Sequence, residues 1–310
     1  FEIKCTKIIV ITGSGVTASV VAELTGIRES YLPQTNQNNY QYIYGCTDES
    51  ASNYDSNANA NNGSCTYAYT LGADPDALFH FDGNSNESCS SGVVSATETG
   101  TITHSSSTGA VTGSTGYVTF AGNVADYITI TSGNGDNAAD PLSLDSAFTI
   151  DFWFQVPTDA TNQIIFCPDS WNGSTGGGLT LIRFGSAGMM GNHKWDIVQN
   201  GPNDHLIFDD NVQIAANTWY HIAVTRTAAG LYKMFQDGVL LTNSVGTNPL
   251  GSIETINFPA GGMQMGAEPT VMGMGGAATN IFSIDEFRIT KGTAIDFASE
   301  GKPTQPYTCS

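Results

Sequence analysis

The sequence has few basic residues. Lys and Arg together number 10, whereas Asp and Glu number 29, and the formal net charge is −19. Proteins bind phosphate backbones and anionic membranes through Lys and Arg, so this composition argues against nucleic acid and an anionic membrane surface as partners. An acidic chain of this kind is compatible with calcium binding and with solubility in salty water.

Histidine, paired cysteine motifs and long apolar runs are also scarce. The chain has 5 His, and its 6 cysteines include no Cys-x-x-Cys pair, which argues against a zinc site. No apolar run approaches the length of a membrane span. Because the first residue is Phe1 rather than Met, we expect that a signal peptide has been removed or that the numbering starts inside a longer precursor.

What the sequence does contain points to β structure. Its 310 residues suffice for one large domain with smaller pieces, or for two domains, and for a sizeable core. Gly, Ser, Thr, Asn and Asp interrupt the chain at short intervals, and few apolar patterns have a helical period. This composition favours an all-β protein.

The stretch 147–155 has the clearest strand pattern, because apolar and mixed side chains alternate along it. The apolar set, predicted to face a core, is Phe148, Ile150, Phe152 and Phe154. The mixed set, predicted to face outward, is Thr149, Asp151, Trp153 and Gln155. Stretches 217–226, 231–241 and 281–289 predict strands that pack with it, and Asp237-Gly238 predicts a hairpin turn.

These four stretches, in this order, resemble the laminin-G-like family of concanavalin-A-like jelly rolls. The resemblance covers 76–309, from Ala77–Gly83 through Ala125–Ile130 to Asp285–Gly292. The last of these phrases resembles the version in bacteriophage tail-fibre and other virion proteins. The resemblance implies a concanavalin-A-like jelly-roll sandwich over residues 77–310. It leaves function open, because this fold hosts lectins, hydrolases, adhesins and inert spacers.

Residues 1–44 form a separate segment in this interpretation. Lys7–Thr12 is rich in β-branched residues and is followed by Gly13-Ser-Gly15 and an apolar run, as in dinucleotide-binding folds. That fingerprint needs a second strand ending in an acidic residue, and the polar stretch Leu32–Asn39 does not supply it. We therefore predict a β-hairpin. An isolated hairpin is marginal in water, so it either folds onto the jelly roll or pairs with a neighbouring subunit as an assembly arm.

Residues 45–67 resemble a short repeat of secreted and viral proteins that is similar to thrombospondin type 3 calcium repeats. Cys46 and Cys65 flank 18 residues, and we expect them to be bonded, which would contribute about 3 kcal/mol by closing the loop. The segment fits either a calcium loop or a metal-free disulfide spacer. The linker to the jelly roll is 68–76. The candidate calcium ligands in the repeat are Asp48, Asn53, Asp55 and Asn57.

A second calcium site is implied by the laminin-G resemblance. In such relatives a structural calcium joins the start of the domain to a strand with an Asp-Glu pair, which corresponds here to Asp82 and Asp285. Strand alternation predicts that Asp285 lies on the same face as Phe287 and Ile289, where a carboxylate needs a partner or a metal. The alternative is that backbone amides in the same turns bind both carboxylates.

Catalysis is the less favoured function. No E-x-D-x-x-E motif of jelly-roll glycosidases occurs. His104, His193 and His221 have no obvious Ser or Cys partner, and His221 is expected to be a packed or surface residue of a strand. No cysteine stands out as a nucleophile.

Exposed aromatic rings would support sugar binding, because sugars lay their C–H faces on Trp and Tyr while amides take the hydroxyls. The preferred candidate is Trp171, in a turn that also contains Asn172, although this Trp could instead fold back over a sheet edge. The other candidates are Trp195 and Tyr232.

The remaining cysteines cannot be paired from sequence alone. We expect Cys89–Cys167, which leaves Cys5 and Cys309 to join the two ends or to stay reduced. The sequence as a whole predicts an extracellular or virion-surface fibre or appendage subunit that self-associates and adheres to glycans. The alternatives are a microbial surface or filament adhesin and a secreted carbohydrate-active enzyme.

Overall fold

The computed structural model describes most of the jelly-roll region and a small part of the N-terminal region. The chain divides into two units, Phe1–Ala68 and Tyr69–Ser310. The described residues are 42–45, 47, 55–61, 74–89, 93–123, 125–133, 140–159, 162–168, 178–185, 193–199, 205–209, 213–246, 256–258, 262–267 and 280–309.

In the first unit, two short strands pair in parallel, β1 (Tyr44–Gly45) with β2 (Ala60–Asn61). The side chain of Asn59 accepts a hydrogen bond from the backbone N–H of Ile43 (3.0 Å). The predicted arm strand, the nucleotide-binding alternative and the predicted Cys46–Cys65 bond all lie outside the described residues, so they stay predictions.

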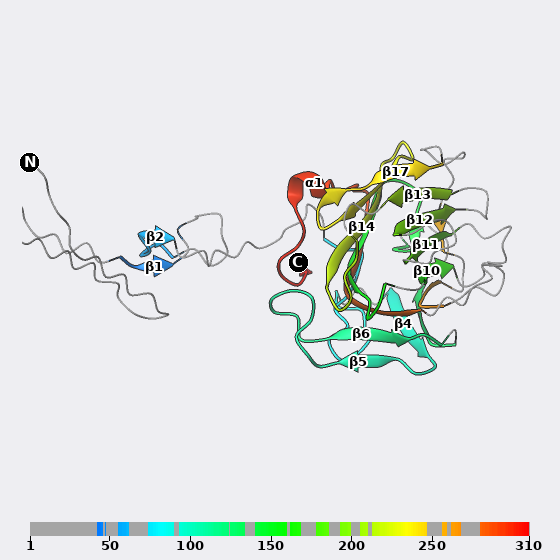
Figure 1. Cartoon of the computed structure of the whole chain (residues 1–310), viewed down its shortest axis with the longest axis horizontal. Helices are drawn as coiled ribbons and strands as arrows, with labels where there is room; N and C mark the ends of the chain where they lie inside the picture. The colour runs from blue at the N-terminus through cyan, green and yellow to red at the C-terminus, as the bar shows by residue number, and fades with distance from the viewer. Residues whose placement is uncertain are drawn as a thin grey trace, which may run out of the picture. The chain divides into compact units, whose positions relative to one another are not determined.

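The second unit is an antiparallel jelly-roll sandwich, as the sequence predicts (Figure 1). The first sheet has the order β17 (Thr242–Val245), β13 (His205–Asp209), β12 (Lys194–Gln199), β11 (Leu179–Phe184), β10 (Gln163–Pro168), β19 (Met263–Met265), β7 (Tyr127–Ser132) and β4 (Val94–Thr99). The second has the order β16 (Val239–Leu240), β15 (Tyr232–Gln236), β14 (Tyr220–Arg226), β9 (Phe148–Gln155), β20 (Ile281–Lys291), β6 (Tyr117–Ala121) and β5 (Thr103–Ser105), with β3 (Ala77–Phe79) paired to β20.

Two smaller elements complete the unit. Strand β8 (Ser143–Leu144) pairs with β18 (Ile256–Asn257), and helix α1 (Phe297–Glu300) lies near the C-terminus. Within the described ranges, no helix is long and apolar enough to cross a membrane.

The core lies between the two sheets and contains the predicted apolar face of β9. Its four side chains are fully buried, and each buried Phe or Ile contributes about 1.5–3 kcal/mol. The ring of Phe154 contacts those of Trp195 and Phe282 from opposite sheets. The members from β9 are Phe148, Ile150, Phe152 and Phe154.

The hairpin predicted at Asp237-Gly238 joins β15 to β16. Both turn residues have positive φ angles, 51° and 80°, as a type I′ turn requires. The side chain of Asp237 also accepts a hydrogen bond from the backbone N–H of His221 (3.1 Å), which ties the turn to β14.

A β-bulge in β20 changes which face Asp285 occupies. The register against β9 shifts between Asp285 and Arg288, and Glu286 has a φ angle of 51°. Because one extra residue is inserted, side chains on the two sides of the bulge have opposite parity. Phe287 and Ile289 lie in the core, whereas Asp285 lies on the outer face. The prediction that these three share a face is therefore wrong.

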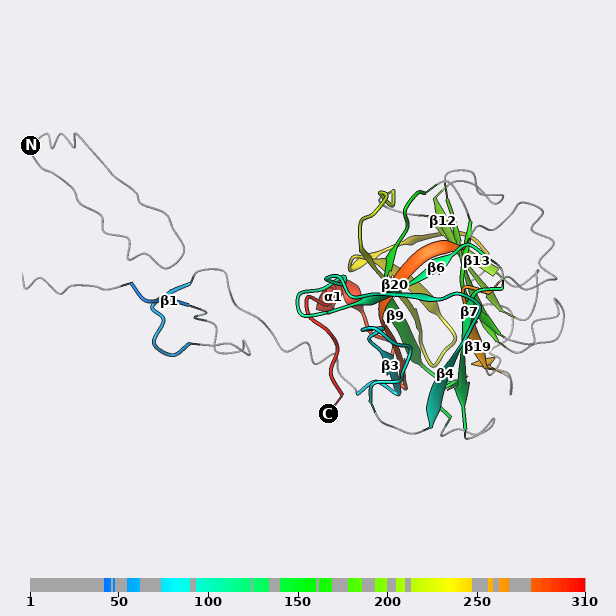
Figure 2. The ribbon, with the colours of Figure 1, turned by 90° about the horizontal axis from the view of Figure 1, so that it is seen from below.

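The outer face of the second sheet is covered, contrary to the prediction that Thr149, Asp151 and Trp153 face outward. These three side chains are buried beneath the C-terminal segment 293–309, which lies against the second sheet on the side away from the first sheet (Figures 1 and 2). Thr149 Oγ1 donates to the carbonyl of Thr293 and accepts from the N–H of Ile295. A small second core forms there from Leu78, Ala223, Phe235, Ile295, Phe297 and Tyr307.

A disulfide between Cys89 and Cys309 fastens the end of this segment. The expected Cys89–Cys167 pair is therefore wrong, because Cys167 is buried on β10 of the other sheet. Cys309 is likewise not joined to Cys5, which lies outside the described residues.

Candidate functional site

The candidate sugar-binding aromatics are not on the described surface. Trp195 is fully buried, with its ring edge-on to Phe154 and the Arg183 guanidinium 5.6 Å from its centre. Tyr232 is 2% exposed, and its hydroxyl donates to Gln199 Oε1 (3.1 Å). Neither ring is available to a ligand in solution, so the prediction that they form an exposed platform is wrong. Trp171 and Asn172 lie outside the described residues.

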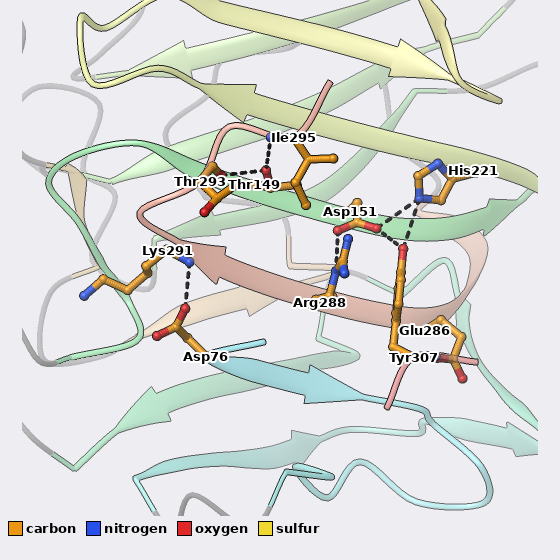
Figure 3. Close-up of polar contacts among 10 residues, drawn as sticks. All are labelled: Asp76, Thr149, Asp151, His221, Glu286, Arg288, Lys291, Thr293, Ile295 and Tyr307. Carbon is orange, nitrogen blue, oxygen red and sulfur yellow. Dashed lines mark hydrogen bonds and ion pairs between the residues drawn. The ribbon is translucent and has the colours of Figure 1, made fainter. Parts of the chain in front are cut away.

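A buried polar network lies under the C-terminal segment instead (Figure 3). Asp151 of β9 accepts a hydrogen bond from Arg288 Nε of β20 (2.8 Å), its direct partner in the strand register. Its other oxygen lies 3.0 Å from His221 Nε2 of β14 and accepts from the hydroxyl of Tyr307. The Arg288 guanidinium stacks 3.9 Å from the centre of the Tyr307 ring. The network joins three strands to the covering segment.

Electrostatics in this network hold a charged pair inside the protein. Burial alone would raise the pKa of Asp151, but the charge of Arg288 and the contact with His221 outweigh it and lower that pKa below its ordinary value. Burial lowers the pKa of His221, and the nearby Asp151 offsets this only in part. Asp151 and His221 are fully buried and Arg288 is 2% exposed, so the network binds the fold together rather than meeting a substrate.

Glu286, at the bulge, also links β20 to the C-terminal segment. One of its oxygens lies 2.7 Å from His80 Nδ1, and the other accepts a hydrogen bond from the N–H of Tyr307 (2.8 Å). The start of the jelly roll, the bulge and the C-terminal segment therefore meet at one carboxylate. Strand alternation does not predict this role, because the role depends on the positive φ angle of Glu286.

Asp82 and Asp285 are brought to the same loop, as the laminin-G resemblance implies. Asp285 Oδ2 accepts from the N–H of Ala110 (2.7 Å) and from Ser114 Oγ (2.8 Å). Asp82 Oδ1 accepts from the N–H of Thr115 (3.0 Å). Both carboxylates thus have the backbone-amide partners that the sequence left as the alternative to calcium.

One oxygen of Asp285 is left over. Its Oδ1 atom is buried and has no hydrogen-bond partner among the described residues. Burial, with the nearby charges of Glu286 and Asp82, raises the pKa of Asp285 from 3.8 to about 7. A buried carboxylate oxygen without a donor is the kind of atom that a calcium ion binds. No group of three or more His, Cys, Asp or Glu in the described ranges could hold a metal, so backbone carbonyls would have to complete the shell.

The described part of the repeat contains two of its four candidate ligands. Asp55 Oδ1 accepts hydrogen bonds from the backbone N–H and the side-chain amide of Asn57, at 2.9 and 3.2 Å. This is an Asx-type turn, which exists with or without metal. Asp48 and Asn53 lie outside the described residues, so calcium binding by the repeat stays a prediction.

A Ser, His and Glu cluster at the sheet edge looks catalytic but lacks the required geometry. His104 Nε2 lies 2.7 Å from Glu98 Oε1 and 3.4 Å from Ser85 Oγ, and Ser85 also donates to Glu98. A proton relay needs the acid on one ring nitrogen and the serine on the other. Here a single nitrogen faces both groups, so the cluster is a hydrogen-bonded link between strands.

The family of this chain is shown by its match to a known family model. A laminin G model described as the concanavalin A-like lectin/glucanases superfamily matches residues 113–294. The chain belongs to this family. No curated protein sequence matches it significantly.

Two solved structures with folds similar to this chain are binding domains of larger proteins. The binding domain of Paraclostridial Mosquitocidal Protein 1 has a TM-score of 0.52 and 14% identity over 72% of this chain. The botulinum neurotoxin serotype G binding domain has a TM-score of 0.51 and 15% identity over 73%. The matched region covers 50% of each of those chains, so this chain spans about half their length. At such identity the similarity establishes the shared fold alone.

Proposed function

We propose that this chain is an extracellular fibre or appendage subunit that binds glycans without catalysis and assembles with copies of itself. The observation that carries this proposal is membership of the lectin/glucanase superfamily in a chain whose innermost carboxylates are engaged by its own groups. The resemblance of the phrase 285–292 to virion proteins favours a virion surface, and a microbial cell surface is the alternative.

The engaged carboxylates favour a lectin over a glycosidase. Glycoside hydrolysis needs two carboxyl groups facing a sugar across a cleft. Asp151 is bound by Arg288, and Glu286 is bound by His80 and by the backbone of Tyr307. Asp285 is bound by the loop at Ala110. These three carboxylates therefore bind other groups of the chain and do not face a sugar across a cleft.

The Cys89–Cys309 bond supports an extracellular location, because disulfides persist in oxidising compartments. The two structural relatives are binding domains, which also fits an adhesive role.

Incubation with a polysaccharide panel tests the proposal. We expect retention of the protein on at least one immobilised polysaccharide, with no release of reducing sugars above a heat-denatured control. Turnover that disappears when one carboxylate pair is mutated would establish the rival, a secreted carbohydrate-active enzyme. Absence of retention on every glycan would contradict the lectin function.

Self-association is proposed through residues 1–44 and through the terminal strands β16 and β17, which we call the rim of the jelly roll. The terminal strands β16 and β17 belong to different sheets, and Val239, Leu240 and Val245 on them are 54%, 45% and 45% exposed. Terminal strands with exposed apolar side chains can accept a strand from another chain. Such head-to-tail pairing gives a ring or a fibre, depending on whether the rotation closes.

Deletion of residues 1–30 should convert an assembled protein into a folded monomer. Strand donation by the arm would be lost, whereas the jelly-roll core lies entirely within 77–310. Light scattering gives the mass and circular dichroism gives the fold. The variant Val239→Ser serves as a test of the accepting rim and should also dissociate the protein. An assembly that survives the deletion would exclude the arm from this role.

Calcium binding at Asp82 and Asp285 is proposed as a stabilising feature. The pKa of Asp285 is higher in the folded state, about 7 against 3.8, so its contribution to stability is full below about pH 4 and is lost as the pH rises through 7. Calcium would reverse this loss, because it binds the charged carboxylate. An ion at a hundred times its Kd adds about 2.7 kcal/mol to the free energy of unfolding.

Thermal melts with calcium and with chelator therefore should diverge as the pH rises from 5 to 8. The variant Asp285→Asn should show neither the pH dependence nor the calcium effect at this site. Identical melting curves with calcium and with chelator at pH 8 would refute both proposed calcium sites.

A further inference from the structure

The three strands at one end of the first sheet present an uncharged, hydroxyl-rich outer face. Their inward side chains, such as Val94, Ile128 and Met263, belong to the core, so alternate residues point outward. We call the outward set the hydroxyl face. Its members are Ser95, Thr97 and Thr99 of β4, Tyr127, Thr129 and Thr131 of β7, and Gln264 of β19.

The strand register arranges these side chains in rows. Thr97, Thr129 and Gln264 are direct neighbours across three strands, and Ser95 faces Thr131 with their hydroxyls 3.2 Å apart. Strands lie about 4.8 Å apart and alternate residues about 6.8 Å apart, so the face measures roughly 10 by 14 Å. The three side chains of β4 are exposed, and those of β7 and β19 are partly exposed.

The absence of charge on this face contrasts with the net charge of −19 of the chain. The nearest charged side chains on the same side of the sheet in the described strands, Lys194 and Asp196, belong to β12. That strand is three positions from β19, or roughly 14 Å away. Glu98, next to Thr97, points the other way and contacts Ser85 and His104.

Cations that could attract an anionic ligand are engaged elsewhere. Every Lys and Arg in the described ranges contacts a carboxylate or a carbonyl oxygen of the chain. The partners are Asp159 for Arg183, Asp209 for Lys194, the Ser146 carbonyl for Arg226, Asp296 for Lys233, Asp151 for Arg288, the Asp140 carbonyl for Lys291 and Asp237 for Lys302.

We infer that the hydroxyl face binds an extended, uncharged polysaccharide. Rows of hydroxyls with one amide match the hydroxyls of a neutral sugar, and Tyr127 adds a ring edge beside the apolar cluster of Ile164, Cys167 and Ile182. Sulfated and uronic glycans are anionic, so the negative net charge of the chain repels them. Every Lys and Arg in the described ranges already contacts an oxygen of the chain. This inference rests on the proposed glycan binding and adds its location and ligand class.

The test compares two arginine substitutions on the same side of the first sheet. Thr97→Arg places a bulky charged group on the hydroxyl face, and Thr242→Arg places it on β17, the opposite terminal strand. Both positions are exposed, so both variants should fold. Retention is measured on neutral polysaccharides (dextran, β-glucan, mannan and agarose) and on sulfated and uronic ones (heparin and alginate). We expect a neutral polysaccharide to be bound, at least tenfold weaker binding for Thr97→Arg, and unchanged binding for Thr242→Arg.

The outcomes separate the inference from the function it depends on. Equal binding of a neutral glycan by both variants overturns the location and leaves the lectin function standing. Retention on heparin or alginate alone overturns the ligand class. Retention on no glycan overturns the proposed function and this inference together. If Thr97→Arg dissociates the protein but still binds neutral glycans, the face is a contact between copies, and the inference fails.

Discussion

Arg288→Ala is expected to lower the free energy of unfolding by about 3–5 kcal/mol, measured by chemical denaturation. Arg288 is the cation closest to Asp151, which is fully buried, and their contact is 2.8 Å long. Removing one member of a buried ion pair leaves the other charged without compensation, and this costs far more than an exposed pair contributes. The hydrogen bonds from His221 and Tyr307 remain but bring no equivalent charge.

Lys302→Ala provides the matched control for Arg288→Ala. Lys302 pairs with Asp237 at 2.9 Å, but both side chains are partly exposed, 42% and 29%. Exposed pairs typically contribute less than about 1 kcal/mol. If the two variants lose the same small amount of stability, Asp151 is not a buried charge that depends on Arg288.

Loss of the Cys89–Cys309 disulfide is the second change with a large expected effect. The two residues are 220 positions apart, and closing so long a loop contributes about 5 kcal/mol in the chain-entropy model, with 2–5 kcal/mol typical of removed native disulfides. Cys309→Ser should therefore lower the melting temperature strongly. A reductant should do the same to the jelly-roll unit of the unmodified protein and should not lower the melting temperature of that unit further in the variant.

Cys167→Ala is the control for a cysteine outside this bond. It removes one buried sulfur from the first sheet and should cost about 1 kcal/mol. A melting temperature that neither Cys309→Ser nor reductant changes would show that the C-terminal segment is held by its apolar and polar contacts alone.

Much of the sandwich could be predicted because strand alternation is a local property. Phe148 to Phe154 reach the core as their period of two requires, and the turn at Asp237-Gly238 forms where two residues tolerate positive φ. The covered outer face could not be predicted in the same way. Asp151 and Tyr307 are 156 residues apart, and nothing near either residue indicates that they meet.

The candidate site could be predicted only in part. The family resemblance paired Asp82 with Asp285, and both contact one loop, while calcium binding there stays a prediction. Strand alternation misplaced Asp285, because the bulge at Glu286 gives the residues before it the opposite parity to those after it. Trp195 and Tyr232 were wrongly predicted to be exposed. The polar group of such a ring can be hydrogen-bonded inside the protein, as the Tyr232 hydroxyl is by Gln199, and the sequence does not show this partner.

The disulfide at the end of the chain also determines how the unit carries tension. The shortest covalent path from Asp76 to Cys309 runs through residues 76–89 and then across the sulfur atoms. Residues 90–308, which hold nearly all of the strands, form a closed loop beside this path. A pull between the segment before Asp76 and the residue after Cys309 therefore acts on strand β3, on its pairing with β20 and on the disulfide, whereas residues 90–308 lie outside the covalent path that carries the tension.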